Sequence, residues 1–123
     1  MALESYFFDT YALVELIVGN PNYERFKEVP FTTTRLNLME LYYGLAIKYG
    51  QSKAEKYFKR FKEFCTEFDD ETLRLAMIFR AQNKKKKFSY VDCISYMIAL
   101  RRRMKFLTGD KGFRGLPNVE YVK

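Results

Sequence analysis

Four acidic residues stand where apolar segments end or continue, and they are the side chains of this chain best placed to do chemistry. Asp9 follows SYFF, and Asp110 follows KFLTG. Glu40 lies inside LNLMELYYGLAI, and Asp92 lies inside FSYVDCISYMIA. Crowding or burying carboxylates without compensation costs several kcal/mol per ion, and no basic residue stands next to Asp9, Glu40 or Asp92. A shared divalent cation would satisfy these side chains together.

The chain contains no histidine, and this absence excludes several classes of active site. Ser-His-Asp triads, Cys-His pairs, histidine-based ribonuclease chemistry and most zinc or iron sites all need an imidazole. Hydrolysis would therefore depend on carboxylates and hard cations. Oxygen ligands suit Mg²⁺ or Mn²⁺, which retain several of their water molecules.

The net charge of +7 comes mostly from the second half of the chain. Between positions 80 and 105 the only acid is Asp92, and the basic residues are Arg80, Lys84, Lys85, Lys86, Lys87, Arg101, Arg102, Arg103 and Lys105. Such a band indicates a polyanionic partner. The alternative is a solvated surface, which is the commoner meaning of a lysine run.

Length and composition indicate one domain spanning residues 1–123. A chain of this length buries one core, and a hydrophobic fraction of 48% with 30% charged residues is typical of a globular domain. No apolar run approaches the ~18 residues of a membrane span, and the start of the chain lacks the pattern of a signal peptide. We therefore expect a cytoplasmic protein without membrane contact. Cys65 and Cys93 are expected to be free, buried thiols.

Strand and helix patterns alternate along the sequence. Strands are predicted at 4–8, 29–33, 63–69, 105–108 and 118–123, and helices at 10–18, 35–49, 52–61, 71–83 and 90–103. This order predicts an α/β fold of three layers, with a mainly parallel four- or five-stranded sheet between helices. Ligands of such sheets bind beyond the carboxyl ends of the strands, where all four acids can converge.

Each acid also has an ordinary structural explanation. Asp9 and Asp92 suit helix N-termini, Asp110 suits a turn after Gly109, and Glu40 could face solvent. Exposure to solvent explains Glu40 least well, because Glu40 is the only charge between Arg35 and Lys48 and Asn37 shares its helical face. Taken jointly, the four positions favour a cluster.

The four segments resemble the PIN domain family of metal-dependent nucleases, and most of all its short VapC-type toxins from prokaryotic toxin-antitoxin pairs. Phe8-Asp9-Thr10 is similar to the family's first acidic motif, and Glu40-Leu41-Tyr42-Tyr43-Gly44 to its second. Ser89-Tyr90-Val91-Asp92 resembles the third, and Thr108-Gly109-Asp110-Lys111-Gly112-Phe113 the fourth. The resemblance covers nearly the whole chain and rests on the order and spacing of all four.

The resemblance implies an endoribonuclease that uses Mg²⁺ or Mn²⁺, forms a homodimer and is silenced by a cognate antitoxin. Water would attack the phosphodiester bond, leaving a 5′-phosphate and a 3′-hydroxyl. Asp9, Asp92 and Asp110 are the expected metal ligands, and Glu40 is a ligand or a base that orients water.

Other residues are candidates for supporting roles. Thr10 and Thr108 could hold the ligands or the phosphate, or could simply cap and close turns. Lys84, Lys85, Lys86 and Lys87 are candidate RNA contacts, and Tyr90 is the best candidate for stacking on a base. Arg101, Arg102 and Arg103 lie two to three turns beyond Asp92 and would contact distant phosphates or another chain.

Other functions have to be compared with the same pattern of acidic and basic residues. A receiver domain would need an acidic pair at the first strand, where Phe8 precedes Asp9, and a dehalogenase-type phosphatase would need D-x-D, where Tyr11 fills the second place. The stronger alternatives are a noncatalytic RNA-binding module and a PIN-type RNA-processing nuclease outside any toxin-antitoxin system.

Overall fold

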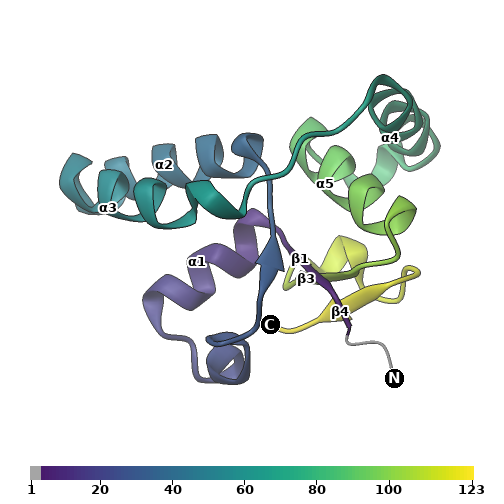
Figure 1. Cartoon of the computed structure of the whole chain (residues 1–123). Helices are drawn as coiled ribbons and strands as arrows, with labels where there is room; N and C mark the ends of the chain where they lie inside the picture. The colour runs from purple at the N-terminus through teal and green to yellow at the C-terminus, as the bar shows by residue number, and fades with distance from the viewer. Residues whose placement is uncertain (1–3) are drawn as a thin grey trace.

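A four-stranded parallel sheet forms the centre of the computed structural model, which describes residues 4–123 (Figure 1). The strands, in their order across the sheet, are β2 (Phe31–Thr32), β1 (Tyr6–Phe8), β3 (Lys105–Thr108) and β4 (Val119–Tyr121). Phe7 of β1 pairs with Thr32 on one side and with Phe106 on the other. The sequence prediction of a mainly parallel sheet is confirmed.

Helices cover both faces of this sheet. Within the described residues the α-helices are α1 (Thr10–Val18), α2 (Arg35–Tyr49), α3 (Gln51–Phe61), α4 (Asp70–Gln82) and α5 (Tyr90–Arg101). Phe8 and Leu107 pack with α1, α2 and α3 in one core, whereas Phe7 and Phe106 pack with α4 and α5 in the other. Successive strand residues point to opposite faces, so the apolar runs supply both cores. The result is the expected three-layer α/β/α arrangement.

Side-chain caps start most of these helices. The N-cap side chains of α1, α2, α4 and α5 each accept a hydrogen bond from a backbone N–H of the first turn, and they belong to Asp9, Thr34, Asp69 and Ser89. Such a cap satisfies one of the N–H groups that the helix leaves unpaired. The cap of α1, Asp9, is itself a candidate acid, and the cap of α5, Ser89, stands three residues before the candidate Asp92.

The predicted strand at 63–69 is wrong. Lys62–Phe64 forms a 3₁₀ turn, η2, and only one bridge, Thr33 to Cys65, joins this segment to the sheet. Strand β2 is only two residues long, so it offers too little edge for a fifth strand. Phe64 also keeps 37% of its side chain exposed, whereas the alternating pattern had suggested a half-buried strand.

Smaller differences concern the ends of elements and the connectors. Helix α5 ends at Arg101 and not at position 103, because Arg103 adopts a positive φ of 56°. The lysine run forms a 3₁₀ turn, η3 (Lys84–Lys86). Cys65 and Cys93 are free thiols, as expected. Among residues 4–123 no helix combines the length and the apolar character needed to cross a bilayer.

Candidate functional site

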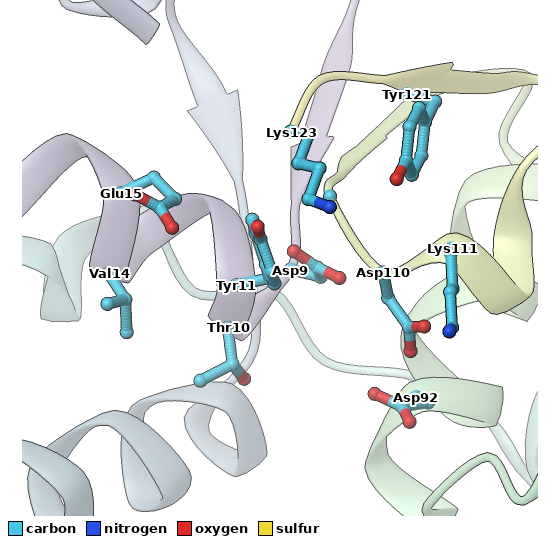
Figure 2. Close-up of a pocket in the computed structure, with 11 residues that line it drawn as sticks. Asp9, Thr10, Tyr11, Val14, Glu15, Asp92, Asp110, Lys111, Tyr121 and Lys123 are labelled. Atoms are coloured by element: carbon cyan, nitrogen blue, oxygen red, sulfur yellow. The ribbon is translucent and has the colours of Figure 1, made fainter. Parts of the chain in front are cut away.

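Three of the predicted acids meet at the carboxyl edge of the sheet. Asp9 directly follows β1, Asp110 follows β3 after one glycine, and Asp92 lies in the first turn of α5. All three line one cavity of about 580 Å³, in which their carboxylates point towards one another (Figure 2). The parallel strands bring β1 and β3 side by side, so residues a hundred positions apart in sequence become neighbours.

Each aspartate is held in place by a backbone N–H. Asp9 Oδ1 accepts from Ala12 at 2.9 Å, and Asp110 Oδ1 accepts from Gly112 at 2.9 Å. Asp92 Oδ2 accepts from the Ser89 N–H at 2.8 Å, while the Ser89 hydroxyl accepts from the Asp92 N–H, which makes a capping box. These backbone bonds use one oxygen of each carboxylate, and the Asp9 carboxylate also has the Thr108 hydroxyl as a hydrogen-bond partner.

Within residues 4–123 the aspartates of the cluster form no salt bridge, although Lys111 and Lys123 line the same cavity. In the part of the chain that the structure describes, the ion pairs involve none of the four predicted acids. Burial raises the pKa of Asp9 to about 7, although hydrogen bonds from Thr108 and Ala12 oppose the shift and repulsion from Asp92 and Asp110 adds to it. Burial also raises the pKa of Asp92, and the charge of Asp110 contributes. Both shifts follow from desolvation and crowding of like charges.

Glu40 lies beside this cavity and not in its wall. The Thr10 hydroxyl, which does line the cavity, donates to Glu40 Oε1 at 2.7 Å. Glu40 is half-buried, and burial together with the charge of Asp92 raises the pKa of its carboxyl group. Glu40 therefore interacts electrostatically with Asp92 from a position behind Thr10, outside the wall of the cavity.

A buried polar network fixes Thr10 from behind. Asn37, only 1% exposed, donates from Nδ2 to the Thr10 hydroxyl at 3.2 Å. Its Oδ1 accepts from the Ser95 hydroxyl at 3.1 Å and from the Thr34 hydroxyl at 2.6 Å. The network joins α1, α2 and α5 at the cavity. The helical face that Asn37 shares with Glu40 pointed to this asparagine, but no sequence pattern indicated that Ser95 and Thr34 complete its hydrogen bonding.

Thr108 links two of the aspartates. Its Oγ1 accepts from the Asp110 N–H at 3.1 Å, and its hydroxyl is a hydrogen-bond partner of the Asp9 carboxylate. Thr108 is fully buried at the end of β3. This threonine therefore sets the position of Asp110 relative to Asp9.

Several other cavity residues were not predicted. They are Tyr11, Val14 and Glu15 of α1, Gly109, Lys111, Tyr121 and Lys123. A Cβ on Gly109 would lie 2.1 Å from a ring carbon of Tyr11 and 2.7 Å from a backbone oxygen, so only glycine allows this wall to close. These residues come from loops and from the half-buried sides of elements, where hydrophobic periodicity carries no signal.

The predicted RNA contacts lie in two separate places. Lys86 Nζ donates to the carbonyl of Gly112 at 2.8 Å, next to Lys111 at the cavity, so one member of the lysine run of residues 84–87 contacts the loop that carries Asp110. The three arginines do not line the cavity. Arg101 pairs with acids of the α4 start, Arg102 bonds to the loop before α4, and Arg103 lines a hollow beside β3.

The donor set suits a hydrated hard cation better than a tightly coordinated one. Among residues 4–123 no three acidic or cysteine side chains are close enough together to hold one metal ion as they stand. The anionic side chains that line the cavity nevertheless offer only oxygen ligands, from the three aspartates and Glu15, and they share the space with Lys111 and Lys123. Mg²⁺ is commonly held by one or two carboxylates and keeps several waters, so water-bridged binding fits this spacing.

Comparisons with known proteins agree with the architecture. The sequence matches the PIN domain family over residues 6–119. No curated protein matches significantly.

Solved structures supply further matches over nearly the whole chain. A toxin-antitoxin complex from Klebsiella pneumoniae is 22% identical, with a TM-score of 0.74 and coverage of 95% of this chain and 96% of that one. VapC20 of Mycobacterium tuberculosis, described as a toxin that cleaves the sarcin-ricin loop, is 17% identical, with a TM-score of 0.79 and coverage of 97% and 100%. VapBC2 of Rickettsia felis, bound to promoter DNA, is 17% identical, with a TM-score of 0.70 and coverage of 96% and 98%. At these identities the likeness establishes the fold.

Proposed function

Because this chain belongs to the PIN domain family, we propose that it is a metal-dependent endoribonuclease acting as the toxin of a toxin-antitoxin pair. The observation that carries the proposal is the meeting of Asp9, Asp92 and Asp110 at the carboxyl edge of a parallel sheet. Within the described residues these three carboxylates form no salt bridge, although Lys111 and Lys123 line the same cavity. The site is therefore suited to bind a divalent ion and a phosphodiester.

The residues have distinct proposed roles. Asp9, Asp92 and Asp110 would hold Mg²⁺ or Mn²⁺ through the carboxylate oxygens that capping leaves over. When bound, such an ion lowers the pKa of water and neutralises charge that develops on the phosphate. Glu40, supported by Thr10, is placed to orient or deprotonate the attacking water or to hold the ion. Thr108, a hydrogen-bond partner of both, would hold Asp9 and Asp110 in position relative to each other.

The partners follow from the same proposal. RNA is the substrate, an antitoxin is the inhibitory partner, and the active unit is a homodimer in the cytoplasm. Two of the similar structures are described as toxin-antitoxin or VapBC assemblies, which supports an antitoxin partner. The lysine run beside the cavity supports a polyanionic substrate.

The decisive experiment is cleavage of a mixed RNA pool by the wild type and Asp92→Asn, in Mg²⁺, in Mn²⁺ and in EDTA. We expect metal-dependent fragments with 5′-phosphate ends from the wild type and none from the variant. Asparagine can still accept the Ser89 N–H bond, so α5 should remain capped. Asp70→Asn, which removes an exposed acid from α4, is the matched control and should cleave normally.

Two results would contradict the proposal. RNA binding that survives EDTA without cleavage, in protein freed of any copurified partner, would indicate a noncatalytic RNA-binding module. Cleavage without toxicity on expression in a bacterial host would support the nuclease activity, but it would indicate an RNA-processing enzyme instead of a toxin.

A further inference from the structure

An exposed aromatic ring with a cation against it stands at the start of α5, two residues before Asp92. Tyr90, the first residue of α5, is 61% exposed. The guanidinium carbon of Arg80 lies 4.2 Å from the centroid of the Tyr90 ring. A cation against one side of an exposed ring can leave the other side free to stack on a ligand.

The ring is held in a fixed position. Arg80 Nε donates to the carbonyl of Phe88 at 2.9 Å, and Phe88 stacks on Phe113 with their ring centroids 4.1 Å apart. The capping box of Ser89 and Asp92 sets the backbone of Tyr90 between them. A surface ordered before its ligand arrives loses less conformational entropy on binding. The backbone of Tyr90 is thus preorganised between Ser89 and Asp92, which hydrogen-bond to each other.

Basic side chains connect this ring to the cavity. Lys111 lines the cavity, and Lys86 bonds to the carbonyl of the adjacent Gly112. Lys86 Nζ also lies 6.0 Å from the centroid of the Phe88 ring, next to the Arg80 contact. A strand leaving the cavity in this direction would therefore meet cations at intervals and then an exposed ring.

This combination of a basic track and an exposed ring is typical of single-stranded nucleic-acid binding. We propose that Tyr90, supported by Arg80, stacks on one base of a single-stranded RNA whose scissile phosphate lies in the acidic cavity. The inference rests on the proposed ribonuclease function and adds the form of its substrate. Tyr90 and Asp92 are two residues apart, so their side chains leave the helix in different directions. The stacked base therefore belongs to a nucleotide outside the cavity, because Tyr90 does not line it, and a base stacked inside a duplex has no free face for the ring.

Tyr49 provides a matched control elsewhere on the surface. It is 42% exposed, and Lys53 Nζ lies 3.9 Å from the centroid of its ring. It ends α2, nine residues and roughly 14 Å of helix rise beyond Glu40. Tyr49→Ala thus removes, at a distance from the cavity, an exposed ring that has a cation against it.

The test measures RNA binding in an Asp110→Asn background, where cleavage does not consume the probe. The probes are a fluorescein-labelled 12-nucleotide oligoadenylate, the same oligomer with abasic residues, and a double-stranded RNA of equal length. Adding Tyr90→Ala should weaken binding of the oligoadenylate roughly 5- to 100-fold. It should leave the other two probes unchanged. Tyr90→Phe, which retains the ring, and Tyr49→Ala should bind oligoadenylate like the background protein.

Each contrary result has a distinct meaning. Equal weakening on the abasic oligomer would overturn stacking, because that probe keeps the phosphates and lacks the bases. Unchanged oligoadenylate binding in Tyr90→Ala would also overturn it while leaving the ribonuclease proposal intact. If the background protein binds no RNA and the wild type cleaves none, the ribonuclease proposal and this inference fail together. In the active protein, Tyr90→Ala should raise KM more than it lowers kcat, with an unchanged melting temperature.

Discussion

Helix α5 has an acidic cluster near each of its ends, and the two clusters are built in opposite ways. At its start, Asp92 faces Asp9 and Asp110 in a cavity where, among the described residues, none of the three forms a salt bridge. At its end, Arg101 pairs with Asp69 at 3.0 Å and with Glu71 at 3.2 Å. Asp69 and Asp92 each accept a hydrogen bond at a helix start, so capping alone does not separate a structural acid from a functional one.

The direction of the pKa shift does separate them. Hydrogen bonds from the Thr72 hydroxyl and N–H lower the pKa of Asp69, and Arg101 adds to the effect. Burial and neighbouring carboxylates raise the pKa of Asp9 and Asp92. The arginine end is therefore satisfied by the chain itself. The cavity end needs something from outside, which is the physical basis for assigning the chemistry there.

The largest expected effect comes from removing one charge at the cavity end. Asp9→Asn should lower the cleavage rate on the order of 10³-fold or more, equivalent to about 4 kcal/mol of transition-state stabilisation. In metal-free protein at pH 8 it should also increase the free energy of unfolding, because a buried carboxylate is replaced by an amide that can still accept the Ala12 N–H bond. Cleavage assays and urea denaturation measure the two effects.

Loss of both activity and stability in Asp9→Asn would contradict the comparison between the two ends. That result would mean that Asp9 holds the fold together as Asp69 does. The exposed acid Asp70 again provides the control, since Asp70→Asn should change neither quantity appreciably.

The second prediction concerns pH. The pKa of Asp9 is raised from 3.8 to about 7, so between these values the folded state binds more protons than the unfolded state. The contribution of Asp9 to stability is therefore full below pH 4 and is lost as pH rises to 7, by up to about 4 kcal/mol.

Urea denaturation of EDTA-treated protein at pH 5, 6, 7 and 8 measures this loss. The difference in unfolding free energy between Asp9→Asn and the wild type should grow with pH over this range and then level off. Added Mg²⁺ should reduce the difference at pH 8, because an ion that binds the folded state stabilises it. A difference independent of pH would show that Asp9 is ionised throughout.

A third, smaller effect should follow from adding a cation to the cavity besides Lys111 and Lys123, which line it already. Val14 lines the cavity and is 36% exposed, whereas Val18, one turn later on α1, is 47% exposed and does not line it. Val14→Arg should compete with the metal, and we expect roughly tenfold weaker Mg²⁺ activation from a partly screened charge pair. The metal-free protein should become more stable at pH 8.

Titration of activity with Mg²⁺ and thermal denaturation in EDTA would measure both changes. Val18→Arg adds the same charge outside the cavity and should behave like the wild type. If the two variants are indistinguishable, the acids at the cavity have no need of a cation.

The sequence contained most of the information needed for the cavity end. Asp9 and Asp92 could be placed because capping positions and apolar runs are local signals, and the parallel topology then brought Asp110 beside them. Glu40 was placed in the right helix, but its position behind Thr10 depends on the packing of α1 against α2. The roles of these acids remain predictions.

The contacts at the arginine end of α5 could not be predicted from the sequence in the same way. The sequence grouped Arg101, Arg102 and Arg103 with the lysine run as RNA contacts, because charge patterns show sign and density but not which acids lie opposite. The structure places Asp69 and Glu71 there through the packing of α4 on α5. The false strand at 63–69 has the same origin, since alternation cannot show that β2 is too short to pair.

The smallest expected effect is at this arginine end. Arg101→Gln removes both ion pairs and the hydrogen bond to the Thr72 hydroxyl, but its acidic partners are mostly exposed, and exposed pairs contribute little to stability. We expect the melting temperature to fall by no more than a few degrees and RNA cleavage to stay within about twofold of the wild type. Calorimetry and the cleavage assay measure these changes. A large loss of cleavage with an unchanged melting temperature would place Arg101 on the RNA path, and the contrast between a self-satisfied end and a functional end of α5 would then fail.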